Sequence, residues 1–383
     1  MRNKIPVILV LLTLCLVIAF PALANAEPNT PPIETTAESA VLMDYVSGHI
    51  LFSKEPDLEL PMASVTKLMT LLLAVEAVDE GKLDLSDTIV TSEYAASMGG
   101  SQVYLEPGEE MSVEEMLISI AVGSANDCSV AMAEHIGGSE ENFVKMMNKK
   151  VKDMGLNHTH FSNTTGLPIE NHYTSAHDMA FILKENLKYP LFKKLSSIYE
   201  YDLRGGEFKL WSTNKLLKWY EGADAGKTGW TNDAKYCLAS SAKKEGMRLI
   251  AVVLGTPEPR SHFRECIKLF NYGFSQYQMV KLQDAGARVK TVDVNKGTVE
   301  KLGLVTSKEA GVVVPKGQDE GFRGVVKAPD EITAPVKKGQ SIGSYVIMKD
   351  GREITKVPLV AENTVPKASI LKQMHKALNR IYG

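Results

Sequence analysis

The stretch that follows Pro61 constrains the fold of this chain more than any other. Residues 68–75 are apolar except for Thr70 and are dominated by good helix formers. Proline is favoured close to the start of a helix, and Pro61 lies just ahead of Ser64. A helix that is apolar on all sides has to be buried. We therefore expect the chain to be built around one central helix that runs from about Ser64 to Asp79.

Ser64 and Lys67 both fall in the first turn of that helix. Residues three apart share a helix face, so the serine hydroxyl and the lysine amine can meet as a nucleophile and its base. The N–H groups at a helix start also favour a developing oxyanion. The pattern alone is weak, since such pairs are mostly solvated and Ser-x-x-Lys occurs elsewhere in the chain, beginning at Ser212, Ser240, Ser241 and Ser369.

Length and composition narrow the class of protein. The 383 residues allow two domains and an ample core. The chain is 44% apolar and 23% charged with a formal net charge of −3, which argues against a disordered protein and a nucleic-acid binder. The eight histidines are scattered and no Cys/His cluster has metal-site spacing, so we expect neither a metal nor a cofactor.

The N-terminus predicts export. Arg2 and Lys4 precede an apolar run over residues 7–20, and small residues at 22–26 supply cleavage positions, so residues 1–26 form a predicted signal peptide. An uncleaved membrane anchor is the alternative, but the apolar run is short for a span. The mature chain keeps three cysteines, which allow at most one disulfide: Cys128, Cys237 and Cys266.

The order of periodic segments predicts a mixed α/β (α+β) domain over residues 27–275, with a sheet flanked by helices and a helical insertion. The strand-like runs are 40–46 and 49–53 around Ser47-Gly48, 199–203 and 207–211, and 236–242 and 248–255. The helical runs are most of 83–156, with a capping box at Ser112, then 174–187 and 259–274.

The composition changes after about residue 275. Residues 276–365 predict a small all-β domain, with short strands at 311–315, 324–328 and 344–348 and a hairpin turn at Lys349-Asp350-Gly351. Residues 366–383 carry apolar side chains on one helical face and basic ones on the other, namely Lys367, Lys372, Lys376 and Arg380, which predicts an amphipathic helix that anchors the chain to a membrane surface. Packing of this helix on the β domain or on a partner is the alternative.

Two distant segments change the meaning of Ser64. Ser124-Ala125-Asn126 lies between predicted helices, 60 residues after Ser64, and Lys227-Thr228-Gly229 follows 103 residues later, just before a strand. Each is weak alone. Ser-x-x-Lys, Ser-x-Asn and Lys-Thr-Gly in this order resemble the motif set of the penicillin-interacting serine enzymes.

The resemblance is narrower than that superfamily. Residues 41–54, 60–64, 157–163, 166–167 and 171–180 resemble the low-molecular-mass D-alanyl-D-alanine carboxypeptidases, peptidase family S11. The resemblance spans nearly all of the mature chain. It implies a β-lactamase/transpeptidase-like antiparallel sheet flanked by helices, a small C-terminal β domain and a terminal amphipathic anchor. It also implies an exported enzyme of cell-wall maturation and cell shape, held at the outer face of the cytoplasmic membrane or in the cell wall.

The resemblance implies a role for each motif residue in cleaving a peptidoglycan stem peptide that ends in D-Ala-D-Ala. Ser64 is the nucleophile, and Lys67 is its base, with a pKa lowered by burial and by Lys227. Ser124 relays a proton to the leaving amine. Four further roles concern the substrate. Asn126 holds the substrate amide or Lys67, and Lys227 and Thr228 bind the terminal carboxylate. Gly229 leaves room for the substrate along the strand, and the N–H groups of Trp230 and Ser64 form the oxyanion hole. β-Lactam antibiotics are the implied covalent inhibitors.

Three alternatives stay open. A β-lactamase needs a deacylating base, and no Glu-x-x-Leu-Asn stretch occurs between residues 127 and 226. A DD-endopeptidase and a non-catalytic wall-binding or penicillin-sensing protein are the others.

Other polar and thiol groups are interpreted as structural or solvated: His158, His160, His172, His177, Cys128, Arg260 and Arg264.

Overall fold

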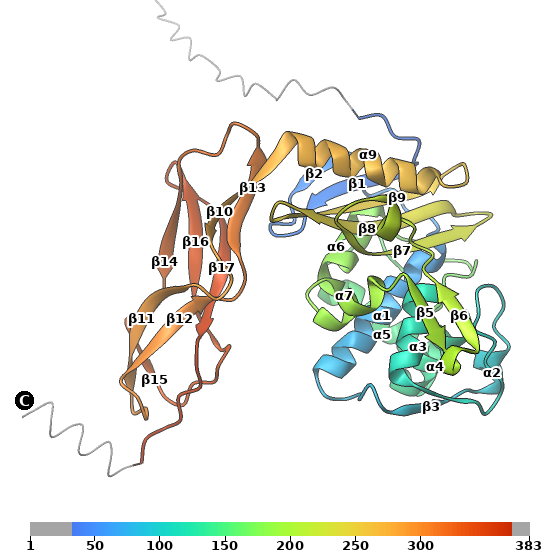
Figure 1. Ribbon diagram of the computed structural model, residues 1–383, viewed down its shortest axis with the longest axis horizontal. Coiled ribbons are helices and arrows are strands. Elements are labelled where there is room, and N and C mark those ends of the chain that lie inside the picture. The colour runs from blue at the N-terminus through green and yellow to red at the C-terminus, as the bar shows by residue number, and fades with distance from the viewer. Residues whose placement is uncertain (1–32, 370–383) are drawn as a thin grey trace, which may run out of the picture. The chain divides into compact units, whose positions relative to one another are not determined.

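The computed structural model describes residues 33–369, so the predicted signal peptide and residues 370–383 of the predicted anchor helix lie outside the described residues. A five-stranded antiparallel sheet in the order β2-β1-β9-β8-β7 forms the centre of the first part (Figure 1). Its strands are β1 (Ser39–Asp44), β2 (Ile50–Lys54), β7 (Ala223–Thr231), β8 (Lys235–Lys244) and β9 (Met247–Thr256). Both predicted hairpins of this sheet, β1–β2 and β8–β9, are confirmed.

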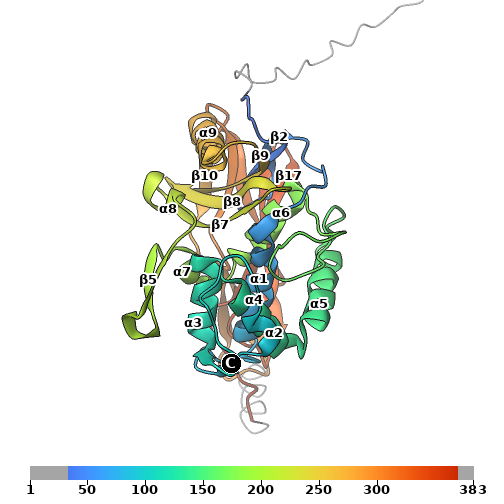
Figure 2. The ribbon, with the colours of Figure 1, turned by 90° about the vertical axis from the view of Figure 1, so that its right-hand side faces the viewer.

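Strand alternation gives the sheet two apolar faces. Leu249, Ala251 and Val253 of β9 pack with the long helix α9 (Ser261–Gln276), which covers one face. Ile250 and Val252 point to the other face and join the larger core with the helices α1 and α6. Figures 1 and 2 show the sheet between these layers. Successive side chains on a strand point to opposite faces, which explains why β9 is apolar throughout.

The remaining helices form one body on the second face. A 3₁₀ turn, η1 (Ala63–Thr66), leads into α1 (Lys67–Asp79), which is buried along most of its length as its apolar run predicts. The other elements here are α2 (Glu93–Ala96), α3 (Val113–Ile118), the π-helical turn η2 (Ser119–Gly123), α4 (Asn126–Gly137), α5 (Glu140–Asp153), α6 (Ala176–Asn186), α7 (Pro190–Ser196) and the hairpin of β5 (Glu200–Leu203) and β6 (Phe208–Trp211), with a 3₁₀ turn η3 (Arg204–Gly206) between its strands. The short helix α8 (Leu216–Trp219) lies on the α9 side of the sheet instead, where Leu216 joins the smaller core and Trp219 contacts Phe263 edge to face.

Two local predictions are refined or corrected by the structure. The stretch 83–156 is mostly helical, as predicted, but it also contains two short strands, β3 (Thr88–Val90) and β4 (Glu110–Ser112), which pair around a loop. That loop contains Gly99-Gly100 and Pro107-Gly108, which break a helix. The Lys-Thr-Gly motif lies inside β7 rather than ahead of a strand. The capping box is confirmed, since the Ser112 hydroxyl accepts a hydrogen bond from the Glu115 N–H.

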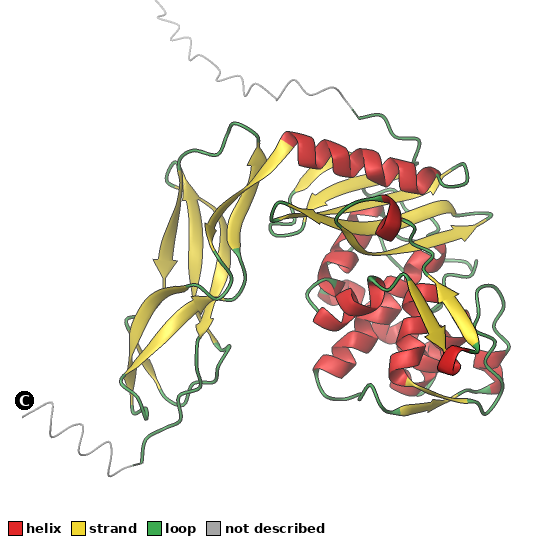
Figure 3. Ribbon diagram, viewed as in Figure 1, coloured by secondary structure: helices red, strands yellow, loops and turns green. Residues whose placement is uncertain are grey.

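Between α9 and residue 369 the regular elements are all strands (Figure 3). β10 (Tyr277–Gln283) pairs with β13 (Ala310–Pro315), and a second sheet runs in the order β14-β16-β17-β12-β11-β15. Its strands are β11 (Arg288–Asn295), β12 (Lys301–Thr306), β14 (Phe322–Lys327), β15 (Glu331–Thr333), β16 (Ser341–Lys349) and β17 (Arg352–Ala361). Their inward residues form a separate apolar core. The predicted strands and the β16–β17 hairpin are confirmed.

The first residues of the predicted anchor helix are not helical. The Pro366 carbonyl accepts a hydrogen bond from Thr298, and Ala368 donates to Lys296, so residues 366–368 run alongside 296–298. A helix in this segment therefore cannot begin at residue 366. Across residues 33–369 no helix is both long and apolar enough to cross a bilayer.

Candidate active site

Ser64 lies in the η1 turn at the N-terminal end of α1, half-buried while its neighbours are buried. Ala63, just before it, has a positive φ of 49°, which is uncommon for a residue with a Cβ. Gly166 packs flat against this backbone, since a Cβ there would lie 1.9 Å from the Ala63 carbonyl oxygen. Gly166 also has a φ of 88°. The loop around Gly166 therefore holds the turn that presents Ser64.

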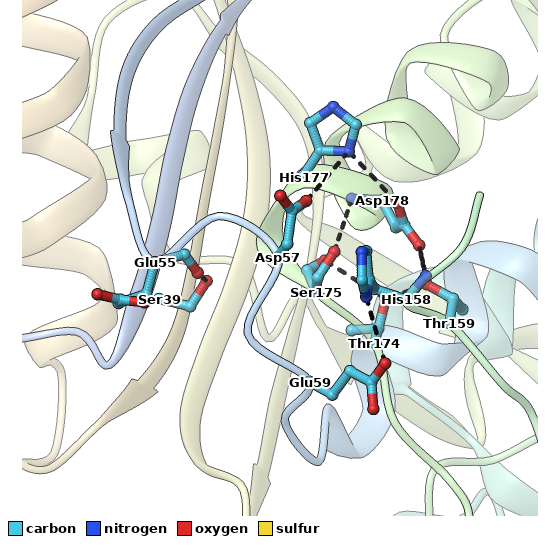
Figure 4. Close-up of polar contacts among 10 residues, drawn as sticks. All are labelled: Ser39, Glu55, Asp57, Glu59, His158, Thr159, Thr174, Ser175, His177 and Asp178. Carbon is cyan, nitrogen blue, oxygen red and sulfur yellow. Dashed lines mark hydrogen bonds and ion pairs between the residues drawn. The ribbon is translucent and has the colours of Figure 1, made fainter. Parts of the chain in front are cut away.

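A polar cluster supports the chain just ahead of Ser64 (Figure 4). Leu60 pairs through its backbone with Thr174. The Asp178 carboxylate accepts hydrogen bonds from the His158 N–H at 2.8 Å and the Thr159 hydroxyl at 2.9 Å. The Thr159 and Thr174 hydroxyls lie 2.8 Å apart. The segment before η1 is therefore connected through Thr174 and Thr159 to the buried carboxylate of Asp178 in the first turn of α6.

The histidines belong to this support. His158 lies 3.2 Å from Glu59, and His177 lies 3.3 Å from Asp178. His172 Nε2 lies 2.7 Å from the Thr66 hydroxyl, and burial lowers the pKa of His172 to about 4. His172 is thus neutral at pH 7. None of the three makes a hydrogen bond to Ser64 within residues 33–369.

Lys67 is fully buried beside Ser64, with three oxygens around its amine. Its Nζ lies 2.6 Å from the Asn126 Oδ1, 2.7 Å from the Thr165 carbonyl and 3.1 Å from the Ser64 Oγ. A neutral amine has two N–H donors and one lone pair. The amide oxygen and the carbonyl can only accept, so they take both N–H groups. The lone pair is then directed at the Ser64 hydroxyl.

The pKa of Lys67 is lowered well below its ordinary value. Burial is the largest cause, because the charged form loses its hydration, and the positive charge of Lys227 adds to it. The buried carboxylate of Asp127 opposes the shift. The site therefore favours the neutral amine, which is the form able to take a proton.

The second motif lies where η2 meets α4. Ser124 sits between them in a left-handed conformation, with a φ of 63°, and only 3% of its surface is exposed. Its hydroxyl makes no hydrogen bond within the described part of the chain. Asn126 is fully engaged: Oδ1 accepts from Lys67, while Nδ2 donates to the Gly99 carbonyl at 2.6 Å. Asn126 thus orients the lysine.

The third motif places a buried cation on the edge strand β7. Lys227 is 1% exposed, and its Nζ donates to the Thr228 carbonyl at 3.0 Å. It has no carboxylate partner among residues 33–369. Burial lowers its pKa to about 7. A buried ammonium without a counter-ion favours an incoming anion, since a partner carboxylate would offset its lost hydration.

Gly229 brings β7 against the Ser64 turn. A Cβ at this position would lie 2.7 Å from the Met62 carbonyl oxygen and 2.9 Å from the Ser64 nitrogen, so only glycine permits the approach. β7 has a sheet neighbour on one side only, which leaves its other edge open beside Ser64. Trp230 follows with 54% of its surface exposed and its ring tilted over Tyr236.

Some groups around the site had no signal in the residue pattern. The Thr165 and Gly99 carbonyls are backbone oxygens, which any residue type supplies. Among the discounted groups, Arg264 is exposed and pairs with Glu258. The cysteines Cys128, Cys237 and Cys266 are buried and free, so the one disulfide that composition allowed is not present among the described residues.

Comparison with known proteins gives consistent results for both parts of the chain. Residues 24–258 match the model of the D-alanyl-D-alanine carboxypeptidase family, peptidase S11, and residues 277–367 match the C-terminal domain of penicillin-binding protein 5. The chain is 46% identical over 354 residues to D-alanyl-D-alanine carboxypeptidase DacF of Bacillus subtilis, covering 91% of each.

Solved structures agree. Penicillin-binding protein 5 from Haemophilus influenzae is 33% identical with a TM-score of 0.69 over 88% of this chain and all of that one. Penicillin-binding protein D2 from Listeria monocytogenes, in its ampicillin-bound form, is 27% identical with a TM-score of 0.59 over 64% of this chain and all of that one. The ordered motifs meet around Ser64 on this shared fold, and the chain therefore belongs to the peptidase S11 family of D-alanyl-D-alanine carboxypeptidases.

Proposed function

We propose that this chain is a serine carboxypeptidase that removes the terminal D-alanine from peptidoglycan stem pentapeptides through an acyl-enzyme on Ser64. One observation carries the proposal. The buried amine of Lys67 has both N–H groups taken by Asn126 and Thr165, and its lone pair faces the Ser64 hydroxyl 3.1 Å away. This is a serine poised to lose its proton to a neutral base.

In the first step, Lys67 takes the Ser64 proton as Oγ attacks the carbonyl carbon between the two D-alanines. The carbonyl oxygen becomes an oxyanion, which the backbone N–H groups of Ser64 and Trp230 stabilise. The carbon–nitrogen bond then breaks. The leaving amine takes the proton from Lys67, with the Ser124 hydroxyl as relay, and free D-alanine departs.

In the second step, water attacks the Ser64 ester. Lys67, neutral again, takes a proton from the water, and Ser64 Oγ regains a proton as the shortened peptide leaves. The enzyme is restored with one peptide bond hydrolysed. Covalent catalysis replaces one difficult step by two easier ones.

Recognition of the chain end falls to β7. The Lys227 ammonium and the Thr228 hydroxyl suit a terminal carboxylate, which would give Lys227 the counter-charge that no described residue provides. The open edge of β7 suits an extended peptide that adds as a further strand, with Gly229 allowing it to pass close to Ser64. A substrate that ends in an amide would leave the buried Lys227 unpaired.

A β-lactam ring presents a strained amide and a carboxylate to the same groups, so we expect penicillins to acylate Ser64. We expect the adduct to be long-lived. Among residues 33–369 no carboxylate makes a hydrogen bond to Ser64 or Lys67, whereas a β-lactamase needs an efficient base for deacylation. The ampicillin-bound relative supports this part of the proposal.

The test is D-alanine release from a pentapeptide ending in D-Ala-D-Ala, with Ser64→Ala as control. We expect release by the wild type and none by the variant. Absence of release by the wild type would refute the carboxypeptidase proposal and leave the non-catalytic, penicillin-sensing alternative. Cleavage of two cross-linked stem peptides would support the DD-endopeptidase alternative. Fast hydrolysis of penicillin would support the β-lactamase alternative.

We also propose that the protein is exported and held at a membrane surface by its C-terminal helix. The basic and apolar N-terminus and the amphipathic pattern of residues 370–383 support this. Membrane fractionation of the full chain beside a chain ending at residue 369 tests it. Equal amounts of both in the membrane fraction would contradict the anchor.

A further inference from the structure

A small hollow of about 60 Å³ opens beside Ser64 between the loop after Gly166 and the end of β7. It has room for roughly four water-sized groups. One wall is apolar and consists of Leu167, Pro168 and Ile169. Thr231 and Asp233, from the end of β7 and the turn after it, also line the hollow. The mechanism above uses none of these residues.

The order of groups along β7 tells which part of the substrate reaches this hollow. Lys227 and Thr228 anchor the terminal carboxylate, and Gly229 lies against the Ser64 nitrogen, where the reacting carbonyl must be. A peptide extended along the strand continues past Gly229 in the same direction. The residue that precedes the two D-alanines therefore lies beside Thr231 and the hollow.

Asp233 gives the hollow a charge. Its carboxylate is exposed in the β7–β8 turn and makes no ion pair or side-chain hydrogen bond within residues 33–369. The turn itself is fixed, because the Thr231 hydroxyl accepts a hydrogen bond from the Ala234 N–H at 3.0 Å. Ile169, which lines the same hollow, is 55% exposed. A hollow lined by apolar side chains and a free carboxylate matches a side chain with an aliphatic stem and a cationic end.

From this arrangement, and given the proposed carboxypeptidase function on which it rests, we infer that Asp233 is a specificity-determining residue that selects an amine-bearing side chain on the residue before D-Ala-D-Ala. The methylene stem packs on Ile169 and Leu167. The ammonium group pairs with Asp233 at the rim. The pair is solvent-exposed, so its effect is modest and screened by salt.

The experiment compares two peptides, Nα-acetyl-L-Lys-D-Ala-D-Ala with its side-chain amine free or acetylated, by D-alanine release. We expect the wild type to prefer the free amine in kcat/KM by about two- to fivefold, as for an exposed ion pair. Asp233→Asn should lower kcat/KM for the free amine alone and abolish the preference. Asp233→Glu should restore part of it. Glu245→Gln, which removes one negative charge in the distant β8–β9 turn, should behave as the wild type.

The possible outcomes distinguish a failure of the role of Asp233 from a failure of the carboxypeptidase function. Equal rates on both peptides with the wild type, or an equal loss on both with Asp233→Asn, would overturn the role of Asp233 and leave the carboxypeptidase function standing. No release from either peptide by the wild type would refute the function and the inference with it. A preference that persists undiminished at 1 M salt would also contradict an exposed ion pair.

Discussion

Replacing Lys227 by methionine should make the protein more stable and less able to recognise a carboxylate. The structure supplies the magnitude. A lysine pKa of about 7, instead of its usual 10.5, means that the buried site disfavours the ammonium form by about 4–5 kcal/mol. Methionine matches the lysine stem in length and carries no charge. Allowing for the lost hydrogen bond to the Thr228 carbonyl, we expect the free energy of unfolding at pH 7 to rise by about 2–4 kcal/mol.

The gain in stability from Lys227→Met should depend on pH. Between about pH 7 and 10.5 the unfolded chain holds a proton on Lys227 that the folded chain has lost. The stability of the wild type therefore rises with pH across this window. The Lys227→Met protein lacks this contribution. Its advantage should shrink to below about 1 kcal/mol at pH 10.

Urea unfolding followed by tryptophan fluorescence is the assay. The three tryptophans of the chain, Trp211, Trp219 and Trp230, all lie before residue 277, so the signal reports the part that contains the site. Lys243→Met, at an exposed position on the same sheet, is the matched control and should change stability by less than about 0.5 kcal/mol. A Lys227→Met protein no more stable than the wild type at pH 7 would refute the claim that the site holds a costly charge for its substrate.

Three further outcomes follow from the same geometry. The value of kcat/KM for a peptide with a free carboxylate should fall above about pH 7, as Lys227 loses its charge, and Lys227→Arg should move this limb to higher pH; an unmoved limb would assign it to another group. Gly229→Ala should lower kcat about 100-fold, because its Cβ meets the Met62 carbonyl at 2.7 Å and displaces the strand; unchanged kinetics would contradict the close approach. Asn126→Asp should raise the pKa of Lys67 and shift the acid limb of acylation to higher pH, whereas a shift to lower pH would contradict their contact at 2.6 Å.

The fold was predictable where its signals are local. The apolar run of α1, the two hairpins of the central sheet and the capping box at Ser112 each depend on residues close in sequence. The strands β3 and β4 have three residues each, too few to show a period of two, and they were missed. The helix α7 (Pro190–Ser196) is also too short to show a clear helical period, and it was missed for the same reason.

The site was predictable only in its side chains. The motifs name Ser64, Lys67 and Asn126, and the structure brings them within hydrogen-bonding distance. The Thr165 carbonyl accepts an N–H of Lys67 and so helps to direct the lysine lone pair. Because every residue has a backbone carbonyl, the sequence could not predict this contact. The hollow at Asp233 depends on how two loops meet across the sheet edge, which spacing along the chain does not encode.

If Lys67 is the neutral base that takes the Ser64 proton, replacing it by arginine should slow acylation of Ser64. Arginine stays protonated in proteins and cannot accept the serine proton. Fluorescent penicillin and time-resolved gel labelling give the rate, with Ser64→Ala as the unlabelled baseline and thermal unfolding as a check that the variant is folded. We expect folded Lys67→Arg protein to be acylated at least about 100-fold more slowly than the wild type. Acylation at the wild-type rate would contradict this role of Lys67.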